Sequence, residues 1–260
     1  MRKNFKDKEL IVFDLDGTLT ETKSPLMQDV AFLLVRLLEQ KQIAIIGGGR
    51  YRQFRAQFLK QFRAPKELLG HLYLFPTTAT AFYRYRHGWR KVYVHELSRR
   101  DRANIKKAFH AVLEEIHYVP PDRVYGQVIE DRRTQVSFSA LGQDIVARLG
   151  AKGVRLKKEW KRKHTDIKMK IAKLVARRLP HLEVRAAGFT TVDVTKRGID
   201  KAYGLRQIQK YLHVPIKEML FIGDAIFPGG NDYAVVKTGV DYLKVSGPAQ
   251  TKKLIRNLLK

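Results

Sequence analysis

The feature that most constrains the fold is a set of short, uninterrupted apolar runs. Residues 10–13, 43–46 and 219–222 form such runs, and each stops at aspartate or glycine. Runs of four apolar residues are too short for helices and are typical of strands buried on both faces of a parallel sheet. Residues 25–40, between the first two runs, carry leucine and valine at helical spacing. The chain therefore opens as strand, helix, strand, helix, which predicts a parallel sheet with right-handed crossovers.

The pattern changes in the middle of the chain, where helical and alternating strand patterns mix. The elements expected there are a helix over 98–117, strands near 124–130 and 135–139, a helix over 165–178, and strands near 183–186 and 190–194. Such a mixture indicates an α+β module inserted into an α/β domain. We predict a Rossmann-like parallel-sheet core of residues 1–95 and 196–260, interrupted by an α+β cap domain of residues 96–195.

The composition excludes several classes of protein. There is no cysteine among the 260 residues, which excludes a disulfide scaffold, a thiolate zinc site and a cysteine nucleophile. Hydrophobic residues make up 44% of the chain, enough to build a packed core. No apolar stretch suits a signal peptide or approaches the ~18 residues of a membrane span. We expect a soluble, cytoplasmic protein with no membrane partner, whose oligomeric state stays open, a homodimer included.

The first strand ends in a pair of carboxylates. Asp14 and Asp16 flank Leu15, Gly17 allows a sharp turn, and the hydroxyl of Thr18 can tie that turn down. Ligands bind at the carboxyl ends of strands in open parallel sheets. Two carboxylates so close repel each other, so the arrangement needs a cation or a protonated partner. Mg²⁺, a hard ion that binds carboxylate and phosphate oxygens, fits the first alternative. One carboxylate can attack a phosphoryl group while the other transfers protons.

Three further residues fit the same chemistry. Asp224 follows the strand expected at 219–222, so it can reach the same edge of the sheet and ligate the metal. Asp232 lies in a tight Pro-Gly-Gly-Asn-Asp loop, from which it can hold metal-bound water or orient Lys201. A lysine near the nucleophile would neutralise phosphate charge in the transition state.

These motifs resemble those of a known superfamily. The segments FDLDGT and FIGDAIFPGGND together are similar to the first and last motifs of the haloacid dehalogenase (HAD) superfamily, and Lys201 matches its lysine motif. The position of the long insertion resembles subclass IIB, whose large α+β cap occurs in sugar phosphatases and in eukaryotic-type phosphomannomutase. The resemblance to phosphomannomutase continues in TVDV…GIDK (191–201), IEDR (129–132) and SALG (139–142).

The resemblance implies a role for each matching residue. Asp14 would be the nucleophile, Asp16 the general acid and base, and Lys201 their catalytic partner. The residues implied to form the metal site are Asp14, Asp16 (through its carbonyl), Asp224 and Asp232. Those implied to contact substrate or phosphate are Thr18, Arg132, Thr191 and Asp193.

Two departures from the mutase pattern favour hydrolysis. The second motif, residues 46–50, reads IGGGR and offers no hydroxyl, so the backbone N–H groups of Gly47 and Gly48 would cradle the phosphate. Gln143 stands where the mutase pattern has an arginine, and a mutase must bind a phosphate at each end of its sugar. We therefore expect a Mg²⁺-dependent phosphatase acting on a phosphorylated sugar or similar small metabolite, with a phosphomannomutase-like mutase as the alternative.

The charge of the chain raises a third hypothesis. Lys and Arg outnumber Asp and Glu by 51 to 25, a formal net charge of +26, and cations crowd residues 152–178. Such a segment can bind the phosphates of a nucleic acid, with an inactive HAD fold as its scaffold. The intact set of five site residues speaks against an inactive enzyme. We favour a solvated helix face joined to a loop that attracts anionic substrate.

Overall fold

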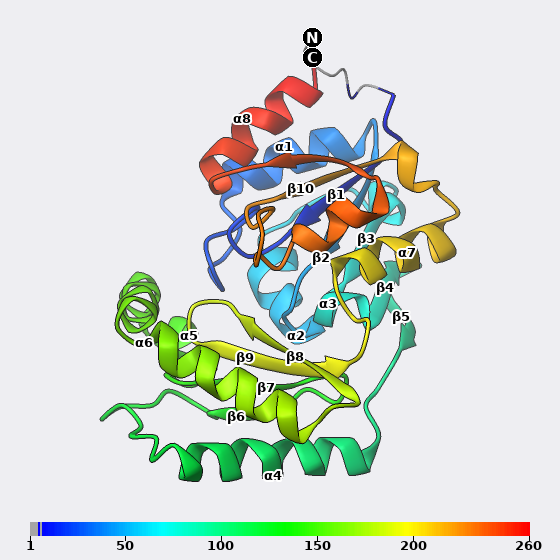
Figure 1. The fold of residues 1–260 in the computed structure, drawn as a ribbon. Coiled ribbons are helices and arrows are strands. Elements are labelled where there is room, and N and C mark those ends of the chain that lie inside the picture. Colours follow the sequence, from blue (N-terminus) through cyan, green and yellow to red (C-terminus); the bar gives the residue numbers. More distant parts are fainter. Residues whose placement is uncertain (1–4, 6) are drawn as a thin grey trace. The chain divides into compact units, whose positions relative to one another are not determined.

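The computed structural model describes residue 5 and residues 7–260, which form two compact units (Figure 1). One consists of the described residues up to Val94 together with Ile199–Lys260 and is called the core unit below. The other, His95–Gly198, is called the cap unit. The sequence places the inserted domain at 96–195, within three residues of these boundaries.

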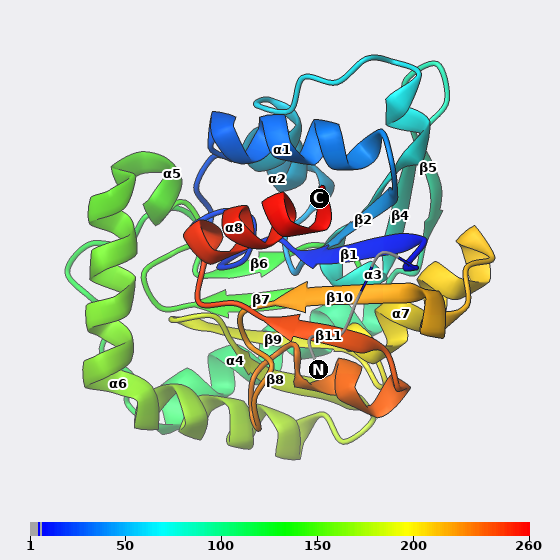
Figure 2. The ribbon, with the colours of Figure 1, turned by 90° about the horizontal axis from the view of Figure 1, so that it is seen from above.

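The core unit is built on a seven-stranded sheet (Figure 2). The strands follow the order β11 (Asp241–Lys244), β10 (Met219–Gly223), β1 (Leu10–Asp14), β2 (Gln42–Ile46), β3 (Leu72–Phe75), β4 (Ala81–Tyr85) and β5 (Trp89–Val94). From β11 to β3 neighbouring strands pair in parallel, whereas β4 and β5 are antiparallel. The prediction of a Rossmann-like, parallel-rich α/β core is confirmed.

Helices cover both faces of this sheet because its central strands β1 and β10 are buried at every position. Ile11 and Phe13 belong to a cluster with residues of α1 (Gln28–Leu38) and α8 (Pro248–Leu258), whereas Leu10 and Val12 belong to one with residues of α7 (Lys201–Leu212). Successive side chains of a strand point to opposite faces, so the two clusters lie on opposite sides of the sheet. The shorter helical elements are α2 (Tyr51–Phe54), η1 (Arg55–Leu59), η2 (Leu68–His71), α3 (Pro76–Ala79), η3 (Ile216–Glu218) and η4 (Tyr233–Thr238).

The cap unit is a four-stranded antiparallel sheet with helices on one face. The strand order is β6 (Ile129–Asp131), β7 (Val136–Ser139), β9 (Thr191–Lys196) and β8 (Leu182–Ala187). Phe138 and Val192 pack with Phe109 of α4 (Arg99–Glu115) and Ile171 of α6 (Ala151–Arg178); α5 (Ile145–Leu149) joins this core.

The other face of the cap sheet is polar. The register places Glu130 opposite Ser137, Ser137 opposite Asp193, and Asp193 opposite Arg185. These four residues form one row across the four strands. They alternate with the apolar residues that face the helices, so the polar row lies on the face away from them.

The structure corrects the prediction for the basic segment. A helix was expected from residue 165 only, but α6 begins at Ala151 and runs to Arg178, with a kink at His164 (φ −132°, ψ 26°). Val154 and Trp160 bury one side of the first half in the cap core, which makes that half helical despite its charge. The Thr165 hydroxyl donates to the Lys161 carbonyl at 2.6 Å, a back-bond that bends helices.

The strand expected over 124–130 is limited to Ile129–Asp131. Within residue 5 and residues 7–260, no helix combines the length and the apolar character that crossing a membrane requires.

We predict that Phe138→Ala destabilises the cap unit by about 3–5 kcal/mol, because it removes a fully buried ring from the cap core and leaves a cavity. Urea unfolding followed by circular dichroism measures the loss, and hydrogen exchange should place it in His95–Gly198. Val119→Ala, at a side chain that is 83% exposed, is the matched control. Equal stability of the two variants would contradict this account of the cap core.

Candidate active site

The site in the core unit begins with two neighbouring strand ends. Asp14 is the last residue of β1, and Asp224 follows directly after β10. The two strands pair in parallel with Phe13 opposite Ile222, so both aspartates reach the carboxyl edge of the sheet side by side. Gly17 allows the sharp turn after β1 and the close approach of this turn to Asp224. Its φ is +90°, and a Cβ there would lie 2.7 Å from Asp224 Oδ2.

A buried lysine forms ion pairs with two aspartates at this edge of the sheet. Lys201 is the first residue of α7, and its Nζ forms ion pairs with Oδ1 of both Asp14 and Asp232. Asp200 caps the helix by accepting a hydrogen bond from the Tyr203 N–H at 2.7 Å. Asp232 is held in turn by the Ala225 N–H, which donates to its Oδ2 at 3.1 Å. Asp232 is therefore in contact with Lys201, the contact that one of its two roles suggested by the sequence requires.

Burial and mutual repulsion shift the pKa values of these groups. Burial raises the pKa of the Asp14 carboxyl well above its usual range, and nearby Asp232 and Asp224 add to the rise while Lys201 opposes it. Burial also raises the pKa of Asp224, with Asp232 contributing. For Lys201 burial disfavours the charged form, but Asp14 and Asp232 outweigh it and raise the pKa. These shifts favour the charged form of Lys201. Its single positive charge does not offset the burial and mutual repulsion of the carboxylates.

This donor set fits a divalent metal ion. Asp14, Asp224 and Asp232 each offer a carboxylate oxygen, and these oxygens lie within 4.8 Å of one another. Asp14 Oδ2 is buried and, among the described residues, has no hydrogen-bond partner. Three carboxylates face one ammonium group, so the cluster is two positive charges short of neutrality. Carboxylate oxygens are the ligands that Mg²⁺ prefers.

The Asp16 side chain is held apart from this cluster. Its Oδ1 accepts hydrogen bonds from the Lys23 N–H at 2.6 Å and from Gln57 Nε2 at 2.7 Å. Gln57 lies in the π-helical turn η1, is 3% exposed, and also donates to the Thr20 hydroxyl at 2.5 Å. No sequence motif of the site includes Gln57. Its position between Phe54 and Phe58, on the apolar side of the expected helix, is the sequence pattern that indicates a buried polar side chain with a specific partner.

Thr18 and the glycine segment lie in the same unit but are already engaged in backbone and side-chain contacts. Thr18 is fully buried, and its hydroxyl donates to Asp224 Oδ1 at 3.3 Å, so it links the turn after β1 to Asp224. The Gly47 N–H donates to the Phe75 carbonyl at 3.3 Å, so one of the two expected phosphate donors is engaged in the sheet. A Cβ placed on Gly48 would meet no atom within 4 Å.

A strained segment supports these glycines. Thr77, Thr78 and Ala79 have φ values of 49°, 55° and 59°, in the left-handed region that β-branched residues avoid. The N–H groups of Thr77 and Thr78 donate to the carbonyls of Gly49 and Gly47, both at 2.9 Å. Strain of this kind persists where the surroundings enforce it, often at functional sites.

The candidate residues of the cap unit share the polar face of its sheet. Arg132 Nε pairs with Glu130 Oε2 at 2.7 Å, and its Nη2 donates to Gln143 Oε1 at 3.0 Å. Asp193 Oδ1 is buried and, in the described part of the chain, has no hydrogen-bond partner. Thr191 is opposite Ser139 in the register and points to the same face as Asp193. Gln143 thus contacts the guanidinium that the resemblance assigns to substrate.

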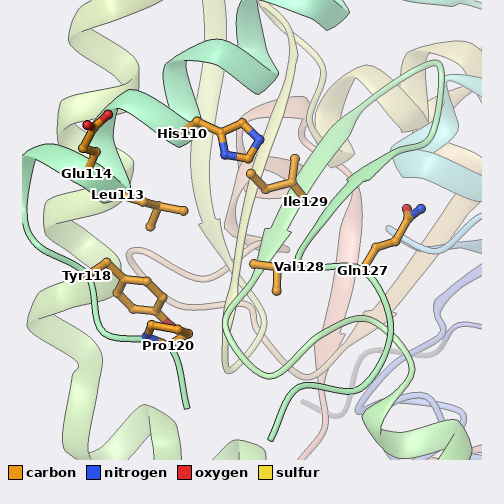
Figure 3. A pocket seen from close by; sticks show the side chains of 8 residues that line it. All are labelled: His110, Leu113, Glu114, Tyr118, Pro120, Gln127, Val128 and Ile129. Carbon is orange, nitrogen blue, oxygen red and sulfur yellow. The ribbon is translucent and has the colours of Figure 1, made fainter. Parts of the chain in front are cut away.

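A separate cavity lies within the cap unit, between α4 and the segment leading into β6 (Figure 3). Its volume is about 560 Å³, and it is lined by His110, Leu113, Glu114, Tyr118, Pro120, Gln127, Val128 and Ile129. Burial raises the pKa of Tyr118 to about 12. None of the candidate site residues lines this cavity.

The fold and the site define the class of the protein. A Rossmann-like core with an Asp-x-Asp pair, a buried lysine and a second acidic strand end, interrupted by an α+β unit, is the arrangement of a HAD-superfamily phosphotransferase. Solved structures agree on the fold. The TM-score is 0.70 with an IMP-bound IMP-nucleotidase of Plasmodium falciparum, at 16% identity, covering 97% of this chain and 68% of that one. It is 0.60 with a haloacid dehalogenase-like hydrolase of Bacteroides thetaiotaomicron, at 15% identity, covering 96% and 99%.

Sequence comparison narrows the class to a family. The model of the eukaryotic phosphomannomutase family matches residues 30–260. A probable phosphomannomutase of Caenorhabditis elegans is 24% identical over 258 residues, covering 97% of this chain and 96% of the relative. Phosphomannomutase of Saccharomyces cerevisiae is 25% identical over 257 residues, covering 97% and 95%. The chain belongs to the eukaryotic phosphomannomutase family, and these relatives fit the mutase alternative better than the phosphatase that the sequence alone favours.

We predict that Mg²⁺ stabilises the protein and that Asp224→Asn removes most of this effect, because a ligand carboxylate is lost. At a Mg²⁺ concentration about 100 times Kd, binding adds about 2.7 kcal/mol to the free energy of unfolding. Thermal unfolding with and without Mg²⁺ measures it, and Asp122→Asn, at an exposed position, is the control. An unchanged Mg²⁺ effect in Asp224→Asn would place the metal elsewhere.

Proposed function

We propose that the protein moves a phosphoryl group between positions of a hexose phosphate, as a Mg²⁺-dependent mutase of the phosphomannomutase type. The group formed by the buried Asp14 and Lys201 and the half-buried Asp224 carries this proposal, because it combines a candidate nucleophile, a fixed cation and a candidate metal ligand at one sheet edge. The relatives named as phosphomannomutases match this chain along nearly their whole length, and their names support the choice of substrate.

Asp14 is the proposed nucleophile. Its carboxylate attacks phosphorus, the bond from phosphorus to the sugar oxygen breaks, and an aspartyl-phosphate forms. Lys201 holds one oxygen of Asp14 and places a positive charge where the phosphoryl group carries negative charge. Asp14, the Asp16 carbonyl and Asp224 would hold Mg²⁺, with Asp232 beside them. The bound ion would supply positive charge that neutralises both the phosphate and the carboxylates.

Asp16 is the proposed general acid and base. It gives a proton to the departing sugar oxygen and later takes one from the hydroxyl that accepts the phosphoryl group. Gln57 and the Lys23 N–H hold one of its oxygens, which fixes the carboxyl group and leaves the other oxygen for the proton. Gln57 is therefore a positioning residue in this proposal.

In the cap unit, Arg132, Thr191 and Asp193 are the proposed contacts of the sugar phosphate. Arg132 can bind phosphate through its guanidinium group, and the unsatisfied Asp193 Oδ1 can accept a hydrogen bond from a sugar hydroxyl. Gly48 is the proposed backbone contact for the transferred phosphate.

Hydrolysis is a second candidate function, and the surroundings of Arg132 favour it. Glu130 neutralises this guanidinium, and Gln143 supplies an amide oxygen in place of the second arginine of the mutase pattern. When the phosphoryl donor is the hexose 1,6-bisphosphate, transfer to Asp14 leaves one distal phosphate on the sugar. A weaker grip on that phosphate would let the sugar phosphate leave before the aspartyl-phosphate is returned to it. Water would then accept the phosphoryl group.

We predict that Asp14→Asn lowers turnover by at least about 10³-fold, because the amide cannot serve as the nucleophile. Phosphorus NMR on purified protein with Mg²⁺ and mannose 1-phosphate, with a trace of the 1,6-bisphosphate, follows the reaction. Asp122→Asn should turn over normally. Turnover in a correctly folded Asp14→Asn variant close to that of the unchanged protein would refute the aspartyl-phosphate mechanism.

The same spectra separate the two candidate functions. Mannose 6-phosphate identifies the mutase, and free phosphate alone identifies the phosphatase. We predict that Gln143→Arg raises the ratio of mannose 6-phosphate to free phosphate severalfold, because a second cation strengthens the cap's hold on the distal phosphate. Gln209→Arg adds the same charge at an exposed position of the core unit and is the control. A ratio that Gln143→Arg leaves unchanged would remove this residue from the choice between the two reactions.

A further inference from the structure

The outer face of α6 carries charge that the active-site chemistry does not use. Its 28 residues contain twelve lysines and arginines and two acidic residues, a net charge of +10. The other 232 residues share the remaining +16 of the chain's +26. Ten of the twelve cations are exposed; only Lys157 and Lys168 are buried.

The exposed cations form a stripe on each half of the helix. Lys152, Arg155, Lys158 and Arg162 follow one another at intervals of three or four residues before the kink, and Lys170, Lys173 and Arg177 do so after it. At 100° per residue each stripe lies opposite the buried residues of its half. The first stripe extends about 15 Å and the second about 10 Å along the helix.

These cations are not balanced by acidic neighbours. Among the described residues, the seven side chains of the two stripes form no ion pair, whereas Lys163 pairs with Glu159 and Arg178 with Glu115. Like charges at this spacing destabilise a helix. The first turn carries Lys152 and no acidic residue, although a helix N-terminus favours negative charge. Helix stability therefore does not explain the stripes.

We propose that the two cationic stripes of α6 bind the phosphodiester backbone of a nucleic-acid duplex, without reading its sequence. A duplex carries one negative charge per about 1.7 Å of axis, so about nine phosphates lie along the 15 Å of the first stripe. Every cation of the stripe can therefore meet a phosphate. The bend at His164 lets the two stripes follow different parts of a backbone (Figures 1 and 2).

The structure favours a duplex over two other polyanionic partners. Single strands bind through aromatic stacking as well as charge, but Trp160, the one aromatic residue of α6 other than His164, is only 7% exposed. An amphipathic helix that binds a membrane surface inserts apolar side chains, but Ile171 and Val175 are buried in the cap core. In α6 the single exposed large apolar side chain is Met169.

Fluorescence anisotropy with labelled duplex DNA and duplex RNA, from about 50 to 200 mM KCl, tests the proposal. The stripe variant changes Lys152, Arg155, Lys158 and Arg162 to glutamine, a good helix former. The control variant makes the same change at four exposed cations of the core unit, Arg206, Lys210, Lys237 and Lys253. Circular dichroism and turnover of the small substrate show that both remain folded. A second stripe variant, with glutamine at Lys170, Lys173 and Arg177, serves if the first is misfolded.

We expect the unchanged protein and Asp14→Asn to bind duplex equally. The first stripe variant should bind at least about tenfold more weakly, and the slope of log K against log salt should fall in magnitude by about 3–4, one unit for each lost phosphate contact. The DNA and RNA arms decide which duplex binds better. Equal losses in the stripe and control variants, absent duplex binding at about 100 mM salt, or tighter binding to anionic lipid vesicles or to single strands would each overturn the proposal.

Discussion

The ion pairs of Lys201 with Asp14 and Asp232 are the interaction on which the rest of the site depends. They are nearly fully buried, where an unpaired charge is costly, so the three side chains must be positioned together. Yet one ammonium group cannot satisfy three carboxylates once Asp224 is included. The remaining negative charge favours the binding of a cation, which is the physical basis for expecting Mg²⁺ in a protein whose overall charge is strongly positive.

Sheet topology brings these residues together over more than two hundred positions in sequence. Asp14 and Asp224 become neighbours because β1 and β10 are adjacent parallel strands, and Lys201 joins them because α7 begins at the same edge. This part could be predicted from the sequence. The apolar runs 10–13 and 219–222 are each long enough for one strand, an aspartate follows each within two residues, and the carboxyl ends of parallel strands meet at one edge.

Other parts depend on contacts that no local pattern contains. Gln57 holds Asp16 from 41 residues away, and only the fold shows that its amide reaches the carboxylate. The contact of Gln143 with Arg132 is of the same kind: the sequence reveals the missing arginine, whereas the structure reveals what the glutamine does instead.

The first half of α6 was missed because its charged residues hide the spacing of Val154 and Trp160. In α8, which was also not predicted, cations interrupt the apolar positions in the same way.

The two proposals assign hydrogen-bonded recognition and excess charge to different surfaces of the cap unit. On the polar face of the cap sheet, Arg132 and Arg185 are each paired with a glutamate, so this face can orient a small ligand through hydrogen bonds without presenting excess charge. A sugar phosphate carries about two negative charges at neutral pH and needs only a few fixed partners. On α6, by contrast, seven exposed cations that form no ion pair with the described residues lie in two rows of regular spacing. Regular spacing matters little to a small anion but much to a polymer whose charges repeat, because each added contact releases a counterion and adds to the affinity.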